Sequence, residues 1–167
     1  MARLLTPLET ILVVLPALAA NGSPVLLKGR GTPLDGGRQL LGKPLLGEGK
    51  TVEGTLLGLA TGSTVALLLA ALYGSLALAF MGFISSLGGL AGDIVAAFIK
   101  RRLGLRRGEP APVLDQLDFY AGSLLALYAA GVVVDLYTAL LMAPLIYVLH
   151  RATNIAAHRK GLKKVPW

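Results

Sequence analysis

Residues 55–99 read TLLGLATGSTVALLLAALYGSLALAFMGFISSLGGLAGDIVAAFI and are almost continuously apolar. As a single α-helix this stretch would reach ~67 Å, at about 1.5 Å per residue, whereas the hydrocarbon core of a bilayer is about 30 Å thick. We therefore predict two membrane-spanning helices, at about 55–72 and 75–99, with a turn at Tyr73-Gly74-Ser75. In the first helix Gly54, Gly58 and Gly62 recur at every fourth position, a spacing that suits close helix packing.

The composition of the whole chain agrees with a membrane protein. Of 167 residues, 54% are hydrophobic and only 15% are charged, against about a quarter charged in soluble domains. The absence of cysteine excludes disulfides and thiolate metal sites, and with only two histidines a zinc site is not expected. A metal would have to be held by carboxylates, which favours Mg²⁺.

Two further apolar stretches flank this central pair. Residues 4–20 predict a first span; Glu9 and two prolines interrupt its apolar core, which disfavours the alternative of a cleaved signal peptide. Residues 119–149 are apolar except for Asp135 and are too long for one ordinary span. We predict two spans there, at about 117–134 and 136–156.

The basic residues set the expected topology. Of the sixteen Lys and Arg residues, only Arg3 falls outside the loop 21–54, the loop 100–116 and the C-terminal region that ends in the tail 157–167. With five spans all three segments share one side, and the positive-inside rule makes that side the cytosol, with the N-terminus outside. The net charge of +7 thus lies mainly at the cytosolic surface of the membrane, where anionic lipids attract basic residues. The charge therefore needs no nucleic-acid partner to explain it, and none is expected. The predicted fold class is an all-α integral membrane protein, with residues 1–167 as a single membrane domain.

Three aspartates gather at the predicted cytosolic face. Asp93 and Lys100 are seven residues apart and share a helix face, which puts Asp93 ~10 Å deeper than Lys100. A carboxylate at that depth is costly unless it is paired or faces a polar cavity. Asp115 and Asp118 lie three apart, on one side of a helical turn. Together they are able to hold one or two Mg²⁺ ions; the alternatives are a helix cap for Asp115 and Asp118 and a structural polar contact for Asp93.

A glycine-rich segment, LLGEGKTVEG, precedes the span at 55–72. It is not a P-loop, because Pro44 stands where that pattern needs a glycine and no strand is expected before it. Lys50 and the amides of the following helix N-terminus nevertheless form a candidate phosphate site. Glu53 is a candidate metal ligand, base or capping carboxylate.

These elements resemble the membrane CTP:phosphatidate cytidylyltransferases, and more closely their archaeal branch, the CDP-archaeol synthases. The resemblance covers roughly residues 21–120. The motifs that carry it are Lys50-Thr51-Val52-Glu53-Gly54, Gly92-Asp93 with Lys100-Arg101, Asp115-Gln116-Leu117-Asp118, Asn21-Gly22-Ser23-Pro24 and Asp35-Gly36-Gly37-Arg38.

The resemblance implies a Mg²⁺-assisted transfer of a cytidylyl group from CTP to 2,3-di-O-geranylgeranylglyceryl phosphate, releasing pyrophosphate. Its partners would be CTP, the isoprenoid glycerol phosphate and the membrane; no oligomeric state is predicted. The implied metal ligands are Asp93, Asp115 and Asp118, and the implied catalytic residues are Lys50, Glu53 and Lys100. The expected substrate-binding residues are Asn21, Ser23, Asp35, Arg38, Thr51, Arg101 and Arg102.

Two other function classes fit the sequence less well. A CDP-alcohol phosphotransferase would need Ala-Arg after an Asp-Gly pair, and Asp35-Gly36 lacks it. A small transporter or lipid-binding protein would be expected to show midplane charges or repeated halves, and neither is clear in the sequence.

Overall fold

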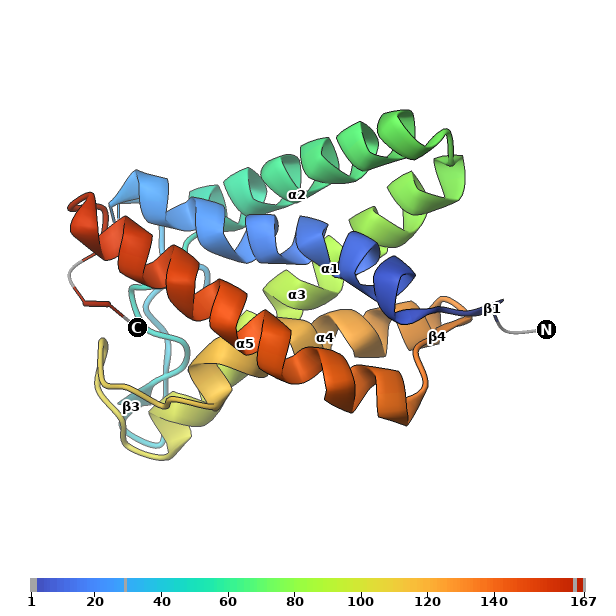
Figure 1. The fold of residues 1–167 in the computed structure, drawn as a ribbon. Helices are drawn as coiled ribbons and strands as arrows, with labels where there is room; N and C mark the ends of the chain where they lie inside the picture. The colour runs from blue at the N-terminus through green and yellow to red at the C-terminus, as the bar shows by residue number, and fades with distance from the viewer. Residues whose placement is uncertain (1–2, 29, 164, 167) are drawn as a thin grey trace.

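The computed structural model describes residues 3–28, 30–163 and 165–166, so the tail cation Lys164 lies outside the described residues. This part of the chain folds into five α-helices, and the predicted all-helical class is confirmed (Figure 1). The helices are α1 (Pro7–Gly22), α2 (Val52–Tyr73), α3 (Leu76–Arg102), α4 (Leu114–Ala129) and α5 (Leu136–Arg159). A 3₁₀ helix, η1 (Ser23–Leu27), continues α1.

Local sequence explains where the helices begin. Thr6 caps α1 in a capping box with Glu9, Thr51 caps α2 by accepting from the backbone N–H of Gly54, and Asp135 caps α5 by accepting from that of Thr138. Each of these side chains satisfies an N–H that the helix itself leaves without a partner. Helix α5 thus starts directly after Asp135, where the sequence analysis placed the turn.

Two small sheets of two-residue strands complete the architecture of the described residues. Strand β1 (Arg3–Leu4) pairs in parallel with β4 (Val132–Val133), and β2 (Gln39–Leu40) pairs antiparallel with β3 (Lys43–Pro44) inside the loop between η1 and α2. Helix α4 ends at Ala129, whereas the sequence analysis placed a span to 134. The reason is that Gly131 adopts a φ of +79° and the chain then forms β4.

Within the described part of the chain, four segments are long and apolar enough to cross a bilayer: residues 7–27, α2, α3 and α5. The protein is therefore a multi-pass membrane protein. Helix α4 has 16 residues and extends ~24 Å, less than the ~30 Å hydrocarbon core. Helix α1 contributes the fully buried Val13, Val14 and Ala17 to the core.

Helix α3 is central and packs against α1, α2 and α4. Small residues let the backbones approach: a Cβ on Gly58 would lie 2.7 Å from the carbonyl oxygen of Ala20, and one on Gly62 would lie 2.4 Å from Oγ of Ser86. The close packing predicted for this glycine spacing is confirmed.

The long loops gather at one end of the bundle (Figure 1). The loop from η1 to α2, the loop from α3 to α4 and the chain after α5 lie together there, while the turn between α2 and α3 and the β1–β4 sheet lie at the opposite end. The three basic segments that the sequence analysis assigned to one side are thus neighbours in space.

Candidate active site

The loop end of the bundle brings the predicted aspartates and lysines together. Asp93 and Lys100 lie in the last three turns of α3, Asp115 and Asp118 lie near the start of α4, and Lys50 directly precedes the cap of α2. The C-terminal part of α3 packs against the N-terminal part of α4. The acidic residues of the two helices therefore lie on either side of this contact.

Two ion pairs connect these segments. Nζ of Lys50 lies 2.5 Å from Oδ2 of Asp93, and these side chains are 25% and 24% exposed. Lys100 pairs with Asp115 across the α3–α4 loop. Partial exposure keeps both pairs open to exchange, because solvent weakens the attraction and a competing ligand can reach the charges.

The third aspartate, Asp118, is buried, and its Oδ1 accepts from the backbone N–H of Phe119 at 2.6 Å. It has been brought close to Asp93 by a helix contact: a Cβ on Gly92 would lie only 2.3 Å from the Asp118 carbonyl oxygen. The carboxylates of Asp93 and Asp118 are near enough for their charges to repel, and Lys50 and Lys100 oppose that repulsion. Two neighbouring carboxylates, of which Asp118 forms no ion pair with a described residue, form a donor set that suits a hard divalent ion.

The carboxylates do not form a closed metal cage. Among the described residues, no three His, Asp or Glu side chains lie close enough to share an ion. Lysines instead neutralise Asp93 and Asp115. The assignment of Asp93, Asp115 and Asp118 as metal ligands stays a prediction.

Asp35 organises the loop that covers this end. Its Oδ2 accepts from the backbone N–H groups of Leu46 (2.8 Å) and Gly47 (3.2 Å), and its Oδ1 accepts from that of Gly37 (2.9 Å). These bonds, that from Leu46 foremost, hold the pKa of Asp35 below its ordinary value. The carboxylate therefore ties two distant parts of one loop together.

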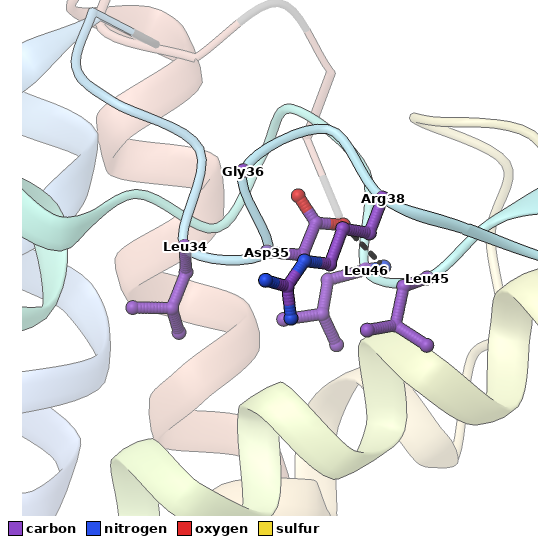
Figure 2. A pocket seen from close by; sticks show the side chains of 6 residues that line it. All are labelled: Leu34, Asp35, Gly36, Arg38, Leu45 and Leu46. Carbon is purple, nitrogen blue, oxygen red and sulfur yellow. Dashed lines mark hydrogen bonds between the residues drawn. The ribbon is translucent and has the colours of Figure 1, made fainter.

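A pocket of about 390 Å³ lies beside this loop, lined in part by Asp35, Arg38 and Leu46. Figure 2 shows the Arg38 guanidinium beside Asp35, while the leucine side chains of the lining project from the loop toward the helices. Arg38 is exposed and remains accessible to an anionic ligand.

Arg102 holds the β2–β3 hairpin against the end of α3. Its guanidinium donates to the backbone carbonyls of Leu40 and Pro44, both at 2.5 Å, and lies 5.3 Å from the ring centre of Phe98. In this structure Arg102 thus serves to fix the loop rather than facing the aspartates.

Its neighbour Arg101 lines a second, larger cavity of about 490 Å³ between the two loops. Arg106, Arg107 and Lys43 also border this cavity, and Arg107 pairs loosely with Glu48 at 3.3 Å. A concave surface with four cations is complementary to a polyphosphate.

Thr51 and Glu53 shape the entry to α2. Thr51 is buried as the helix cap, and the Glu53 carboxylate accepts from the backbone N–H (2.7 Å) and hydroxyl (3.0 Å) of Thr32. These contacts fix the segment that carries Lys50.

Ser23 and Asn21 lie at the end of α1. The Ser23 hydroxyl is buried and donates to the carbonyl of Ala20 at 3.4 Å. The Asn21 amide nitrogen lies 3.4 Å from Nε2 of His150 on α5.

His150 was missed by the sequence analysis, although it is 5% exposed and central to this end. Its Nδ1 lies 3.2 Å from the carbonyl oxygen of Gln116. Because a carbonyl only accepts, Nδ1 carries the proton and Nε2 accepts from Asn21. Gln116 itself is fully buried, and its amide nitrogen and oxygen have no hydrogen-bond partner among the described residues.

Comparisons with known proteins agree with this architecture. The family model described as CarS-like, CDP-archaeol synthase, matches residues 1–167. A CDP-archaeol synthase of Hyperthermus butylicus is 59% identical over 100% of both chains, and one of Aeropyrum pernix is 48% identical over 96% of this chain and 92% of its own. A solved structure, described as an intramembrane enzyme for archaeal membrane lipids biosynthesis, superposes with a TM-score of 0.85 at 46% identity, covering 93% of this chain and 98% of its own. The chain belongs to the CDP-archaeol synthase family.

Proposed function

We propose that this protein transfers a cytidylyl group from CTP to an isoprenoid glycerol phosphate, giving a CDP-activated lipid and pyrophosphate. Its family membership supports this activity. The single observation that carries the assignment of the site is the cluster of three aspartates and two lysines at the loop end of a membrane helix bundle. A soluble nucleotide reaches that end from the water, and a lipid phosphate reaches it along the bilayer.

The reaction exchanges one phosphate bond for another. An oxygen of the lipid phosphate attacks the α-phosphorus of CTP, and the bond from that phosphorus to the oxygen bridging to the β-phosphorus breaks. The electron pair of that bond leaves with pyrophosphate, so atoms and charge balance without a further reactant. Little covalent chemistry is left to the protein, and positioning and charge stabilisation supply the catalysis.

Lys50 and Lys100 are proposed to bind phosphate oxygens. Each of them pairs with an aspartate in the structure. Both ion pairs lie at the loop end of the bundle. When a phosphate group binds there, each lysine can exchange its aspartate for a phosphate oxygen with only a small movement of its side chain. Lysine serves here as a mobile point charge.

Asp93 and Asp118, with Asp115 beside them, are the residues that would hold Mg²⁺. The oxygen-only donor set and the closeness of the Asp93 and Asp118 carboxylates support such an ion, whose positive charge would offset their mutual repulsion. When bound, Mg²⁺ would neutralise phosphate oxygens and favour attack at the α-phosphorus.

The remaining predicted residues divide by their environment. Arg38 and Arg101 border cavities and are proposed as direct phosphate contacts. The others are proposed to hold the loops and helix ends of the site in position, since their polar groups already form hydrogen bonds within the protein: Asn21, Ser23, Asp35, Thr51, Glu53 and Arg102.

We further propose five membrane crossings, with the loop end in the cytosol. The short α4 would complete its crossing together with β4, which follows it and pairs with β1. The distribution of Lys and Arg supports this orientation, because all of them except Arg3 belong to the segments at that end or to the last span leading to it.

A label-transfer assay tests the activity. Purified protein in lipid nanodiscs, given Mg²⁺, CTP labelled at the α-phosphate and the geranylgeranyl glycerol phosphate, is expected to move the label into the lipid fraction. CTP labelled at the γ-phosphate is the matched control and should leave its label in water-soluble pyrophosphate. Failure to label lipid with any of several lipid phosphates would disprove the proposal.

A further inference from the structure

Helix α5 presents a row of polar side chains toward the loop end. His150, Asn154 and His158 recur at every fourth position and therefore share one face. The first of them contacts Gln116, which lies next to Asp115 on α4. The row thus runs from the aspartates toward the C-terminal residues of the chain.

The chain reverses direction at the end of α5. The backbone N–H of Leu162 bonds to the carbonyl of Ala157 (3.0 Å) and that of Gly161 bonds to the carbonyl of His158 (2.9 Å). This is a Schellman motif, and Gly161 has the left-handed φ of +66° that it requires. The His158 ring nitrogen Nδ1 also lies 2.9 Å from the carbonyl oxygen of Lys163. The turn therefore directs Lys163 back along the polar face of α5.

The ammonium group of Lys163 is fixed within that face. Nζ donates to Oδ1 of Asn154 at 2.9 Å, and Asn154 lies one helical turn beyond His150. Burial lowers the pKa of Lys163, and the charges of Asp115, Lys50 and Asp93 act on it. Yet no described carboxylate lies within ion-pair distance of it. Among the described residues, this half-buried ammonium group thus bonds a neutral amide and makes no direct ion pair, while the aspartates that attract it lie beyond ion-pair distance. An anion that came into contact with it would complete the site.

We propose that Lys163 is a third phosphate-binding lysine of the active site, which the C-terminal turn places at the same end of the bundle as Lys50 and Lys100 (Figure 1). This inference rests on the proposed function, because it assigns the anion that would pair with Lys163 to a phosphate group of the substrates. Lys50 and Lys100 must each give up an aspartate to bind phosphate, whereas Lys163 has none to release. It is therefore able to bind the first phosphate that enters.

The test compares variants of two lysines in the same tail. Lys163→Met removes the charge and keeps the length of the side chain, and Lys163→Arg restores the charge. Lys160→Met is the matched control, because Lys160 is exposed to solvent. For each purified variant we would measure binding of CTP and of inorganic pyrophosphate by calorimetry, the KM of CTP, the KM of the lipid phosphate, kcat and thermal unfolding.

We expect Lys163→Met to weaken phosphate binding about 10- to 100-fold, as for loss of one hydrogen bond to a charged group. Lys163→Arg should recover a large part of the loss, and Lys160→Met should stay within about twofold of the parent, a change of less than ~0.5 kcal/mol. A change in CTP and pyrophosphate binding identifies the triphosphate as the ligand, and a change confined to the KM of the lipid identifies the lipid phosphate.

The inference is overturned if Lys163→Met and Lys160→Met match in both binding constants and both KM values while the parent protein is active. An inactive parent protein would instead refute the proposed function, and pyrophosphate binding would still decide the role of Lys163. If Lys163→Met does not fold, Asn154→Leu takes its place: it keeps the charge but removes its anchor. It should weaken the same binding step by a smaller factor, and an unchanged constant would count against the proposal.

Discussion

Replacing Gly92 with alanine should separate Asp93 from Asp118 without removing either carboxylate. A Cβ at residue 92 would lie 2.3 Å from the carbonyl oxygen of Asp118 and 3.0 Å from Cα of Gly122. Ordinary contacts begin at 3.4 Å, so the first distance falls about 1.1 Å short. Both opposing atoms belong to the backbone of α4, which means that the helices must move apart.

The size of that movement sets the expected effect. A displacement of about 1 Å between groups that position a reaction lowers the rate by roughly 100-fold, and overpacking of this kind destabilises by about 1–3 kcal/mol. We therefore expect Gly92→Ala to remain folded with a lower thermal midpoint and to lose most of its kcat. Label transfer from CTP into lipid measures the rate, and thermal unfolding in the same nanodiscs measures the stability.

Gly22→Ala is the matched control for this change. Residue 22 has helical backbone angles, with φ at −80°, and a Cβ there would meet no atom within 4 Å. Its activity and stability should stay close to those of the parent protein. If Gly92→Ala retained more than half of the parent kcat (a change under ~0.4 kcal/mol), the reasoning that this helix contact sets the site geometry would be refuted.

The structure supports further predictions. Removing divalent ions with a chelator should stop turnover without unfolding the bundle, and Mg²⁺ should restore it; full activity in chelator would exclude the carboxylate metal site. Asp35→Ala should loosen the loop and raise the KM of CTP, which amide hydrogen exchange at Leu46 and Gly47 would report; unchanged exchange would show that the carboxylate does not hold the loop. Because the pKa of Asp35 is lowered in the folded protein, the stabilisation of the loop by this carboxylate should be complete above its ordinary pKa of 3.8 and be lost as the pH falls through the lower folded-state pKa. Amide exchange at Leu46 and Gly47, corrected for the pH dependence of the chemical step, should therefore become less protected over this interval, and unchanged protection would contradict the prediction. Since the chain has no cysteine, single cysteines at Lys160 and at Leu72 should react with impermeant reagents from opposite sides, the first from the cytosol; labelling of both from one side would contradict the topology.

Much of the helical framework was predictable because a bilayer imposes strong rules on sequence. Long apolar runs, the turn at Gly74 and the turn near Asp135 placed the helix boundaries within a few residues. Helix α4 was the exception: apolar residues continue past Ala129, but a positive-φ glycine and pairing with β1 end the helix there. Strand pairing between segments as far apart in the sequence as β1 and β4 leaves no local signal.

The candidate site was predictable in its charged residues and not in its contacts. Spacing placed Asp93 and Lys100 on one face and Asp115 and Asp118 on one turn, but it did not reveal that Lys50 pairs with Asp93. Asp35 showed no sign of its role, because its bonds go to backbone groups that carry no side-chain signature.

His150 and Lys163 were missed for a different reason. Each lies at the loop end of the bundle only because α5 packs beside α4 and the chain turns back after α5. A signal was present in the four-residue spacing of His150, Asn154 and His158 and in the glycine at 161. It becomes interpretable once the end of α5 is known to lie beside the loops.

The most direct test of the account compares Asp93→Asn and Asp118→Asn with the parent protein. Both replacements keep the size of the side chain and remove the charge that we propose is used for Mg²⁺ and phosphate chemistry. Pyrophosphate release with CTP, Mg²⁺ and the isoprenoid glycerol phosphate should fall to background in each variant, while thermal unfolding shows an intact bundle. Near-parental pyrophosphate release from either folded variant would contradict the claim that this carboxylate cluster is the catalytic centre.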